Sequence, residues 1–98
     1  MSFIQVIEYD TTRADEIQRL MDEWREGTEG RRTATHAILA RDRSKPDHYV
    51  EVVEFPSYED AKANSELPQT DTLARRMAAL CEGSTRFVDL EVIREEDL

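Results

Sequence analysis

Four stretches of the chain are rich in β-branched and aromatic residues, and their apolar and polar positions tend to alternate, which predicts β-strands. They cover residues 3–9, 33–42, 48–55 and 86–94. The segment SKPD lies between the second and third stretches and contains Pro46, which is typical of a turn. This pattern therefore predicts a β-hairpin over residues 33–55.

After the first predicted strand, the spacing of apolar residues changes to that of a helix. Four of them recur at i, i+3, i+4 and i+7: Ile17, Leu20, Met21 and Trp24. This spacing predicts an amphipathic helix. Thr12 is placed to cap its first turn, with Asp15 three residues on, and Gly27 and Gly30 are placed to end it.

A second helical region, residues 58–82, is interrupted by Pro68. Ser57 and Asp60 resemble a capping pair that opens a short helix at about 58–65. Beyond the proline, a longer helix is predicted by a stripe of apolar residues: Leu73, Met77, Leu80 and Cys81. Proline disfavours the helical conformation in Leu67 and cannot continue the hydrogen bonds of the first helix. We therefore expect two helices here, with Gly83 closing the second.

The predicted order is β-α-β-β-α-β, which is that of the ferredoxin-like split βαβ arrangement. This is an α+β fold with a four-stranded antiparallel sheet and both helical regions on one face. The chain of 98 residues has room for one modest core, so we expect a single domain, 1–98. A domain of this size gains stability from oligomerisation.

Side chains along a strand alternate between two faces, and the two parities differ in character. One is purely aliphatic: Ile4, Val6, Val50, Val52, Val88, Leu90 and Val92. The other mixes aromatics with amides and carboxylates: Phe3, Gln5, Ile7, Tyr9, Tyr49, Glu51, Val53, Phe55, Phe87, Asp89, Glu91 and Ile93. We expect the aliphatic set beneath the helices. Soluble monomers rarely expose a large apolar patch, so we expect a second copy to cover the mixed set in a homodimer, with the polar residues lining a shared or per-subunit cavity.

The parity of the second strand is ambiguous. Ala37 and Leu39 suit the helix side, which leaves His36 and Ile38 for the cavity. Imidazole titrates near neutral pH, so His36 is the candidate catalytic base, against the alternative of a hydrogen-bonded interior histidine.

The net charge of −9 disfavours nucleic acid and anionic membranes as partners, because both carry negative charge. Cys81 is the single cysteine, so no internal disulfide is expected. Neither a leader-like segment nor an apolar run of membrane-spanning length is present, which favours a cytoplasmic location. The chain contains no Cys/His spacing suited to zinc, no glycine-rich nucleotide loop and no nucleophile elbow, so we expect neither metal nor cofactor.

The element order, the length, the segment SKPDHYVEVVEF and the run YEDAKANSELPQTDTLARRMAAL together resemble the dimeric α+β barrel superfamily. Within it, the chain looks most similar to the antibiotic biosynthesis monooxygenase-like (ABM-like) domains. The resemblance implies a homodimer in which two sheets face each other, and a cavity between the sheet and the helices of each subunit. Some members oxidise polyketide-type aromatic substrates without metal or flavin, others cleave haem, and many have no established activity.

The resemblance also implies site residues. Asn64 looks equivalent to a polar residue, often histidine, that follows the helix after the third strand in monooxygenase-like members. Haem-cleaving relatives use an asparagine on the first strand, with a tryptophan and a histidine on or near the second helix. Here the first strand offers Gln5, the single tryptophan is Trp24 on the first helix, and residues 56–98 contain no histidine. These departures disfavour haem cleavage.

Five residues are candidates for binding a substrate: Trp24, Tyr49, Glu51, Asn64 and Ser65. For Trp24 the alternative is core packing, for Tyr49 and Glu51 pairing across a dimer, and for Asn64 and Ser65 capping of the helix that follows. The leading hypothesis is a small-molecule-binding homodimer that acts as a cofactor-independent monooxygenase on an aromatic or polyketide-like substrate. The alternative is a non-enzymatic ligand-binding or stress-response barrel.

Overall fold

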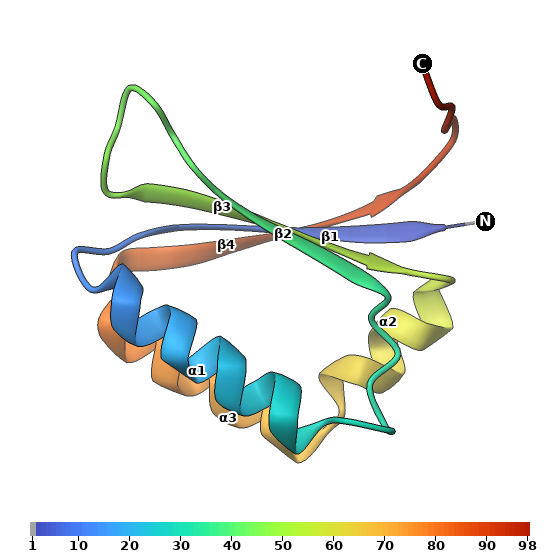
Figure 1. Ribbon diagram of the computed structural model, residues 1–98, viewed down its shortest axis with the longest axis horizontal. Helices are drawn as coiled ribbons and strands as arrows, with labels where there is room; N and C mark the ends of the chain where they lie inside the picture. The colour runs from blue at the N-terminus through green and yellow to red at the C-terminus, as the bar shows by residue number, and fades with distance from the viewer. Residues whose placement is uncertain (1) are drawn as a thin grey trace.

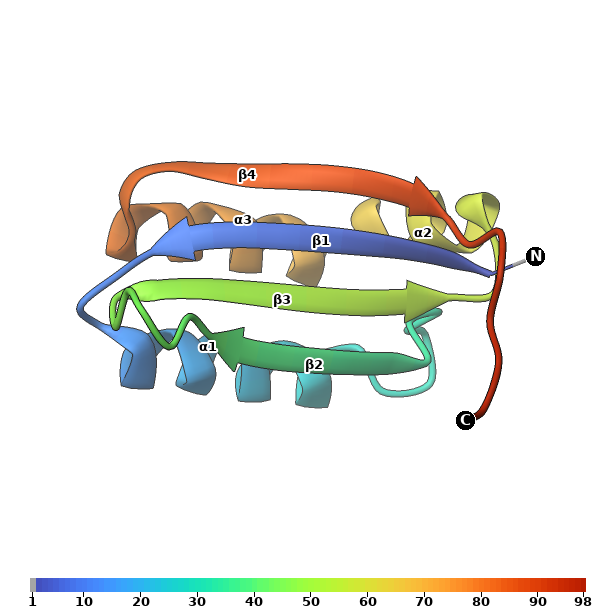
Figure 2. The same ribbon diagram turned by 90° about the horizontal axis from the view of Figure 1, so that it is seen from above.

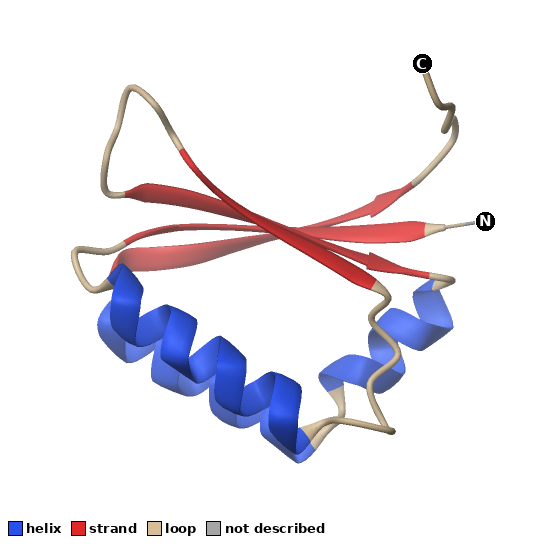
Figure 3. Cartoon of the chain, viewed as in Figure 1, coloured by secondary structure: helices blue, strands red, loops and turns tan. Residues whose placement is uncertain are grey.

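A computed structural model describes residues 2–98 as one antiparallel sheet with helices on one side (Figures 1 and 3). Its elements in chain order are β1 (Phe3–Asp10), α1 (Ala14–Gly27), β2 (His36–Arg41), β3 (His48–Phe55), α2 (Tyr58–Ser65), α3 (Pro68–Leu80) and β4 (Glu82–Glu91). Within this part of the chain, no helix combines the length and apolar character that a membrane crossing needs.

The strands lie side by side in the order β2-β3-β1-β4 and all neighbours are antiparallel, as Figure 2 shows from above. α1 and α3 pack against each other beneath the sheet, and α2 lies toward the other end of the same face (Figure 1). The predicted α+β ferredoxin-like fold is therefore confirmed. Its second helical region forms two helices, which gives the order β-α-β-β-α-α-β.

The break at Pro68 is where the sequence predicts it. Leu67 is extended, with φ −66° and ψ 134°, and Pro68 occupies the first turn of α3, where its missing N–H costs no hydrogen bond. The Ser57 hydroxyl accepts a hydrogen bond from the Asp60 backbone N–H at 3.1 Å, so this predicted cap is confirmed as well.

The entry to α1 and the start of β4 differ from prediction. Thr12 does not cap α1; the neighbouring Thr11 hydroxyl accepts from the backbone N–H of Arg13 at 3.0 Å and donates to the Leu80 carbonyl at 2.7 Å. This second bond ties the start of α1 to the end of α3, a contact that no local pattern encodes. Gly83, with φ 72°, lies inside β4, because the strand begins directly after α3.

The assignment of the two sheet faces is the main correction to the sequence-based prediction. The mixed face packs against the helices, because four of its residues are buried: Phe3, Tyr9, Val53 and Phe55. The aliphatic face is the outer face of the sheet. The strand register extends this assignment of the faces to the neighbouring strands, since Val6 of β1 pairs with both Val52 of β3 and Val88 of β4. The rings of Phe3, Tyr9 and Phe55 fill space between the sheet and the helices in two separate clusters.

The core beneath the sheet is divided into two clusters. Tyr9, Ile17, Leu20 and Met77 form one between β1, α1 and α3. Phe3, Val53 and Phe55 form the other near α2. Ile7 packs against both clusters, and the space between them is not filled by side chains.

Candidate functional site

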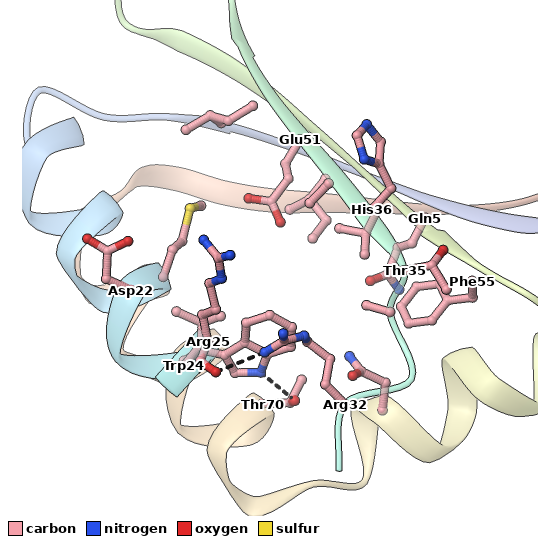
Figure 4. Close-up of a pocket in the computed structure, with 18 of the residues that line it drawn as sticks. Gln5, Asp22, Trp24, Arg25, Arg32, Thr35, His36, Glu51, Phe55 and Thr70 are labelled. Carbon is pink, nitrogen blue, oxygen red and sulfur yellow. Dashed lines mark hydrogen bonds between the residues drawn. The ribbon is translucent and has the colours of Figure 1, made fainter. Parts of the chain in front are cut away.

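A cavity of about 550 Å³ occupies the space between the two core clusters. Its roof is the helix side of the sheet and its floor is formed by α1, α3 and the end of α2 (Figure 4). It opens between α1 and the edge strand β2, where lining residues such as Gln18, Asp22 and Thr35 are exposed. The volume lies within the usual range for small-molecule sites and is sufficient for a fused-ring aromatic.

The floor is centred on Trp24. Its indole N–H donates to the Thr70 hydroxyl at 2.8 Å, which ties α1 to α3 and holds the ring in one orientation. Met21 and Leu73 extend the apolar surface on either side. A fixed indole flanked by aliphatic side chains is a suitable platform for a flat aromatic ligand.

The roof carries one carboxyl group, that of Glu51, which points from β3 toward the helices (Figure 4). Its neighbours across the strands are Ile7 and Leu39, and no hydrogen bond or ion pair from residues 2–98 holds the carboxyl. Burial raises the pKa of Glu51 from its ordinary value to about 7, because the charged form loses hydration in an apolar surround. Near neutral pH this group can therefore accept or release a proton.

Two arginines line the cavity. Arg32 is half-buried; its Nη1 donates to the Arg25 carbonyl at 2.8 Å and to the Thr28 hydroxyl at 3.2 Å. Its guanidinium lies 5.5 Å from the centroid of the Trp24 ring, within cation–π distance. Arg25 extends from α1 into the same space (Figure 4).

Asn64 closes the cavity at the end of α2. The side chain is only 7% exposed, and its Oδ1 is buried without a hydrogen-bond partner among residues 2–98. Buried amides usually find partners, and an unpaired one costs about 1–3 kcal/mol. The Oδ1 of Asn64 is therefore available to accept a hydrogen bond from a group in the cavity.

The structure brings together three of the candidate residues from sequence, Trp24, Glu51 and Asn64, around this cavity. The sequence-based prediction that the His36 side chain faces the cavity is wrong. Ala37 and Leu39 do lie on the helix side as expected, but the cavity is on that side too, so the His36 imidazole points outward (Figure 4). Only its strand position borders the opening, and its Nε2 lies 3.9 Å from the Glu54 carboxylate on the outer face.

Tyr49 and Ser65 lie outside the cavity lining. Tyr49 stacks on Tyr9, with ring centroids 5.9 Å apart, and packs against the core cluster of α1 and α3. Ser65 is exposed, and its hydroxyl donates to the Lys62 carbonyl at 2.8 Å at the end of α2.

Burial, and then the charge of Glu51, raise the pKa of the Tyr9 phenol well above its usual value, so this group stays protonated.

Sequence reasoning missed the polar residues that α1 and the following loop supply. Gln18, Asp22 and Arg25 each follow a residue of the predicted apolar stripe, so they form a second stripe along its edge. That spacing is the signal that could have found them. Arg32 carries no such signal, since only the folded loop brings it onto Trp24.

Across residues 2–98, no three His, Cys, Asp or Glu side chains gather in a way that could hold a metal ion. The cavity instead offers a flat apolar platform, a carboxyl group that titrates near neutrality, an amide and two guanidinium groups. Such a set can bind an aromatic molecule, take a proton from it and stabilise the resulting negative charge.

No protein-family model matches this chain, and a comparison with curated protein sequences gives no match. Solved structures do match over almost the whole chain. One is the cofactor-independent oxygenase SnoaB from Streptomyces nogalater, with 13% identity, a TM-score of 0.81 and coverage of 96% of this chain and 95% of that one. Another is described as an antibiotic biosynthesis monooxygenase, with 18% identity, a TM-score of 0.74 and coverage of 96% and 100%. Rv0793 from Mycobacterium tuberculosis matches with 10% identity, a TM-score of 0.80 and coverage of 99% and 100%.

At these identities a structural likeness establishes the fold, whereas the reaction and the substrate have to be argued from the cavity. The sequence resemblance and the structural matches lead to the same group of proteins. The chain has the fold of the antibiotic biosynthesis monooxygenases.

Proposed function

We propose that this protein is a cofactor-independent monooxygenase that oxidises an enolisable aromatic compound in the cavity beneath its sheet. The observation that carries the proposal is Glu51, a carboxyl group without a partner that faces the Trp24 platform across the cavity and whose pKa is raised to about 7. A general base works best when its pKa lies near the working pH. The SnoaB fold match supports the reaction class.

In the proposed reaction, Glu51 takes a proton from a ring CH₂ group that lies across the ring from a ketone and is conjugated with it through the flanking aromatic rings, as in an anthrone, which leaves an enolate. The enolate passes one electron to dioxygen, and the resulting radical and superoxide combine to form a carbon–oxygen bond. The peroxide takes up the proton from Glu51, and loss of water then leaves a second ring ketone. The sum is CH₂ + O₂ → C=O + H₂O. Asn64 and Arg25 are placed at the cavity to stabilise the enolate oxygen.

We also propose that a second copy of the chain covers the outer face of the sheet, with the aliphatic set, not the mixed one, at the interface. Ile38 on the edge strand β2 is 52% exposed and Leu90 on the opposite edge strand β4 is 42% exposed. Between them lie the β-branched residues of the central strands, which complete an apolar patch. Charged groups lie at the ends of this patch, including Arg86 with Glu8 at 3.1 Å and His48 with Asp10 at 2.9 Å. An apolar centre with a polar rim is the usual anatomy of an interface.

Oxygen uptake with a hydroxyanthrone tests the reaction. The wild-type protein should consume one dioxygen per anthraquinone formed, and kcat/KM should rise as the pH increases through about 7, where Glu51 ionises. Glu51→Gln removes the base and should lower kcat by about 100-fold or more. His36→Gln on the outer face is the matched control and should stay within about twofold of wild type.

No uptake with any enolisable aromatic, or uptake that Glu51→Gln leaves unchanged, would contradict the proposal. Tight binding of such compounds without oxygen uptake would favour the non-enzymatic ligand-binding alternative. Loss of activity in His36→Gln alone would return the base to the position that the sequence suggested.

A further inference from the structure

The charged groups around the cavity are separated by position. Glu51 is on the roof and the guanidinium group of Arg32 is on the floor by Trp24, whereas the side chain of Arg25 extends from α1 toward the roof (Figure 4). Asp22 also lines the cavity, but it lies on the exposed rim of α1, one turn before Arg25. A ligand that reaches the indole therefore meets the positive charge of Arg32, 5.5 Å from the ring centroid, and lies below the proposed base.

Neither arginine has a carboxylate within 4.0 Å among residues 2–98, although the chain has 22 acidic residues and a net charge of −9. Within the described residues, five arginines do have such a partner, namely Arg13, Arg75, Arg76, Arg86 and Arg94, whereas Arg19, Arg31, Arg41 and Arg43 lack one as well. Arg25 and Arg32 differ from the other unpaired arginines because they line the cavity, where a bound anion would supply the missing partner.

Arg32 is held in place by groups that belong to the fold. Its Nη1 is occupied by the Arg25 carbonyl and by the hydroxyl of Thr28, a fully buried residue whose own hydroxyl donates to the Trp24 carbonyl at 2.7 Å. The Nη2 and Nε groups of Arg32 remain without a partner among residues 2–98. These two groups form one edge of the planar guanidinium fork, which is the geometry that pairs with both oxygens of a carboxylate.

We infer that the substrate is an aromatic carboxylate whose ring lies on Trp24 and whose carboxylate is bound by Arg32, with Arg25 adding positive charge. This inference deepens the proposed function and rests on it, because it takes the same cavity as the substrate site. It adds a substrate class and two residues that determine specificity.

Calorimetric titration with an anthraquinone carboxylate and the corresponding carboxamide tests the inference. Both probes are already oxidised, so binding is measured without turnover. The wild-type protein should bind the carboxylate at least about tenfold more tightly than the carboxamide, and the difference should shrink with added salt. Arg32→Gln should lower carboxylate affinity about tenfold or more, while affinity for the carboxamide changes by less than about threefold.

Further variants separate charge from geometry. Arg32→Lys keeps the charge but loses the fork, so it should retain only part of the preference. Arg25→Gln should reduce the preference less than Arg32→Gln does. Arg19→Gln, on the same helix but outside the cavity lining, is the matched control and should bind both probes as wild type does. Far-ultraviolet circular dichroism verifies that every variant is folded, because replacing Arg32 alters the surroundings of Trp24 and hence its emission.

Three outcomes would overturn the inference: equal or tighter binding of the carboxamide by the wild type, no binding of either probe, or an equal loss for both probes in Arg32→Gln. The last would mean that Arg32 acts only by supporting Trp24. These outcomes are separate from failure of the proposed reaction, since a protein that prefers the carboxylate but consumes no oxygen would keep the binding site and lose the oxygenase activity.

Discussion

On the helix side of the sheet, the central strands carry Phe3, Tyr9 and Phe55 together with Gln5 and Glu51, and rings and polar groups enclose a cavity. On the outer side, the same strands carry mainly valines and isoleucines, with charges only toward the ends. The more apolar face is thus the more exposed one. Uniform aliphatic character suits a flat contact with another sheet, whereas large and polar residues suit a space that holds a ligand.

The largest predicted effect is on stability, and it is tested with two separate variants that place a charge at adjacent positions of β3, one on each face of the sheet. Val53 is buried at 8% exposure in a core cluster, so Val53→Asp puts an unpaired carboxylate in the core. We expect a cost of about 3–5 kcal/mol, a large part of the total stability of a domain of this size, and hence loss of the cooperative unfolding transition in urea.

Val52→Asp is the matched variant one residue away, on the outer face. We expect it to fold, with a urea midpoint near that of the wild type under conditions where both are monomeric. Its dimer should dissociate at least about 100-fold more easily, because each copy brings a charge into an apolar contact. Sedimentation velocity measures this difference. A folded Val53→Asp together with an unfolded Val52→Asp would reverse the assignment of the faces.

A smaller effect is expected from the pH dependence of stability, because Glu51 ionises on the cavity side. The pKa of Glu51 in the folded protein, about 7, lies above its ordinary value of 4.5. The folded state therefore binds the proton more tightly than the unfolded state, and the free energy of unfolding should fall as the pH rises from about 4.5 to about 7. The shift corresponds to about 3 kcal/mol at most, and partial exposure of the group reduces this to about 1–2 kcal/mol.

Urea titrations between pH 5 and pH 8 measure this fall, at about 1–2 kcal/mol for the wild type. Glu51→Gln should remove most of it and should be more stable than the wild type at pH 8. Glu54→Gln, which replaces a carboxyl on the outer face, should keep the fall because Glu51 is still present. If Glu51→Gln shows the same fall as the wild type, the cavity does not control the ionisation of this carboxyl.

The contrast between the faces also explains what could be predicted from the sequence. The strands, the helices and the break at Pro68 depend on local signals such as alternation, helical spacing and capping residues, and these were largely correct. The rule that the most apolar face lies beneath the helices failed, because both faces of this sheet are apolar enough to be buried. Alternation separates the two sets of side chains and does not say which set meets the helices.

That error is also why the proposed base changed. The sequence assigns His36 to the cavity because Ala37 and Leu39 suit the helix side. Those two residues do lie on the helix side, but the cavity is there too, and His36 is on the outer face. The sequence makes Glu51 a binding candidate because it belongs to the mixed set, whose polar residues are expected to line a cavity. Glu51 does line a cavity, which lies between the mixed face and the helices. Arg32 reaches the cavity through the fold of the loop from Thr28, which a pattern of apolar residues does not encode.

The smallest predicted effect concerns the floor of the cavity. Thr70→Val removes the acceptor of the Trp24 indole N–H while keeping the shape of the side chain, so a partly buried donor loses its partner. We expect a loss of about 1 kcal/mol in the free energy of unfolding and a shift in the Trp24 emission. Thr72→Val, at an exposed position of α3, makes the same chemical change and should alter neither quantity. Equal behaviour of the two variants would mean that this bond does not hold the indole, and the platform would then depend on Met21, Leu73 and Arg32 alone.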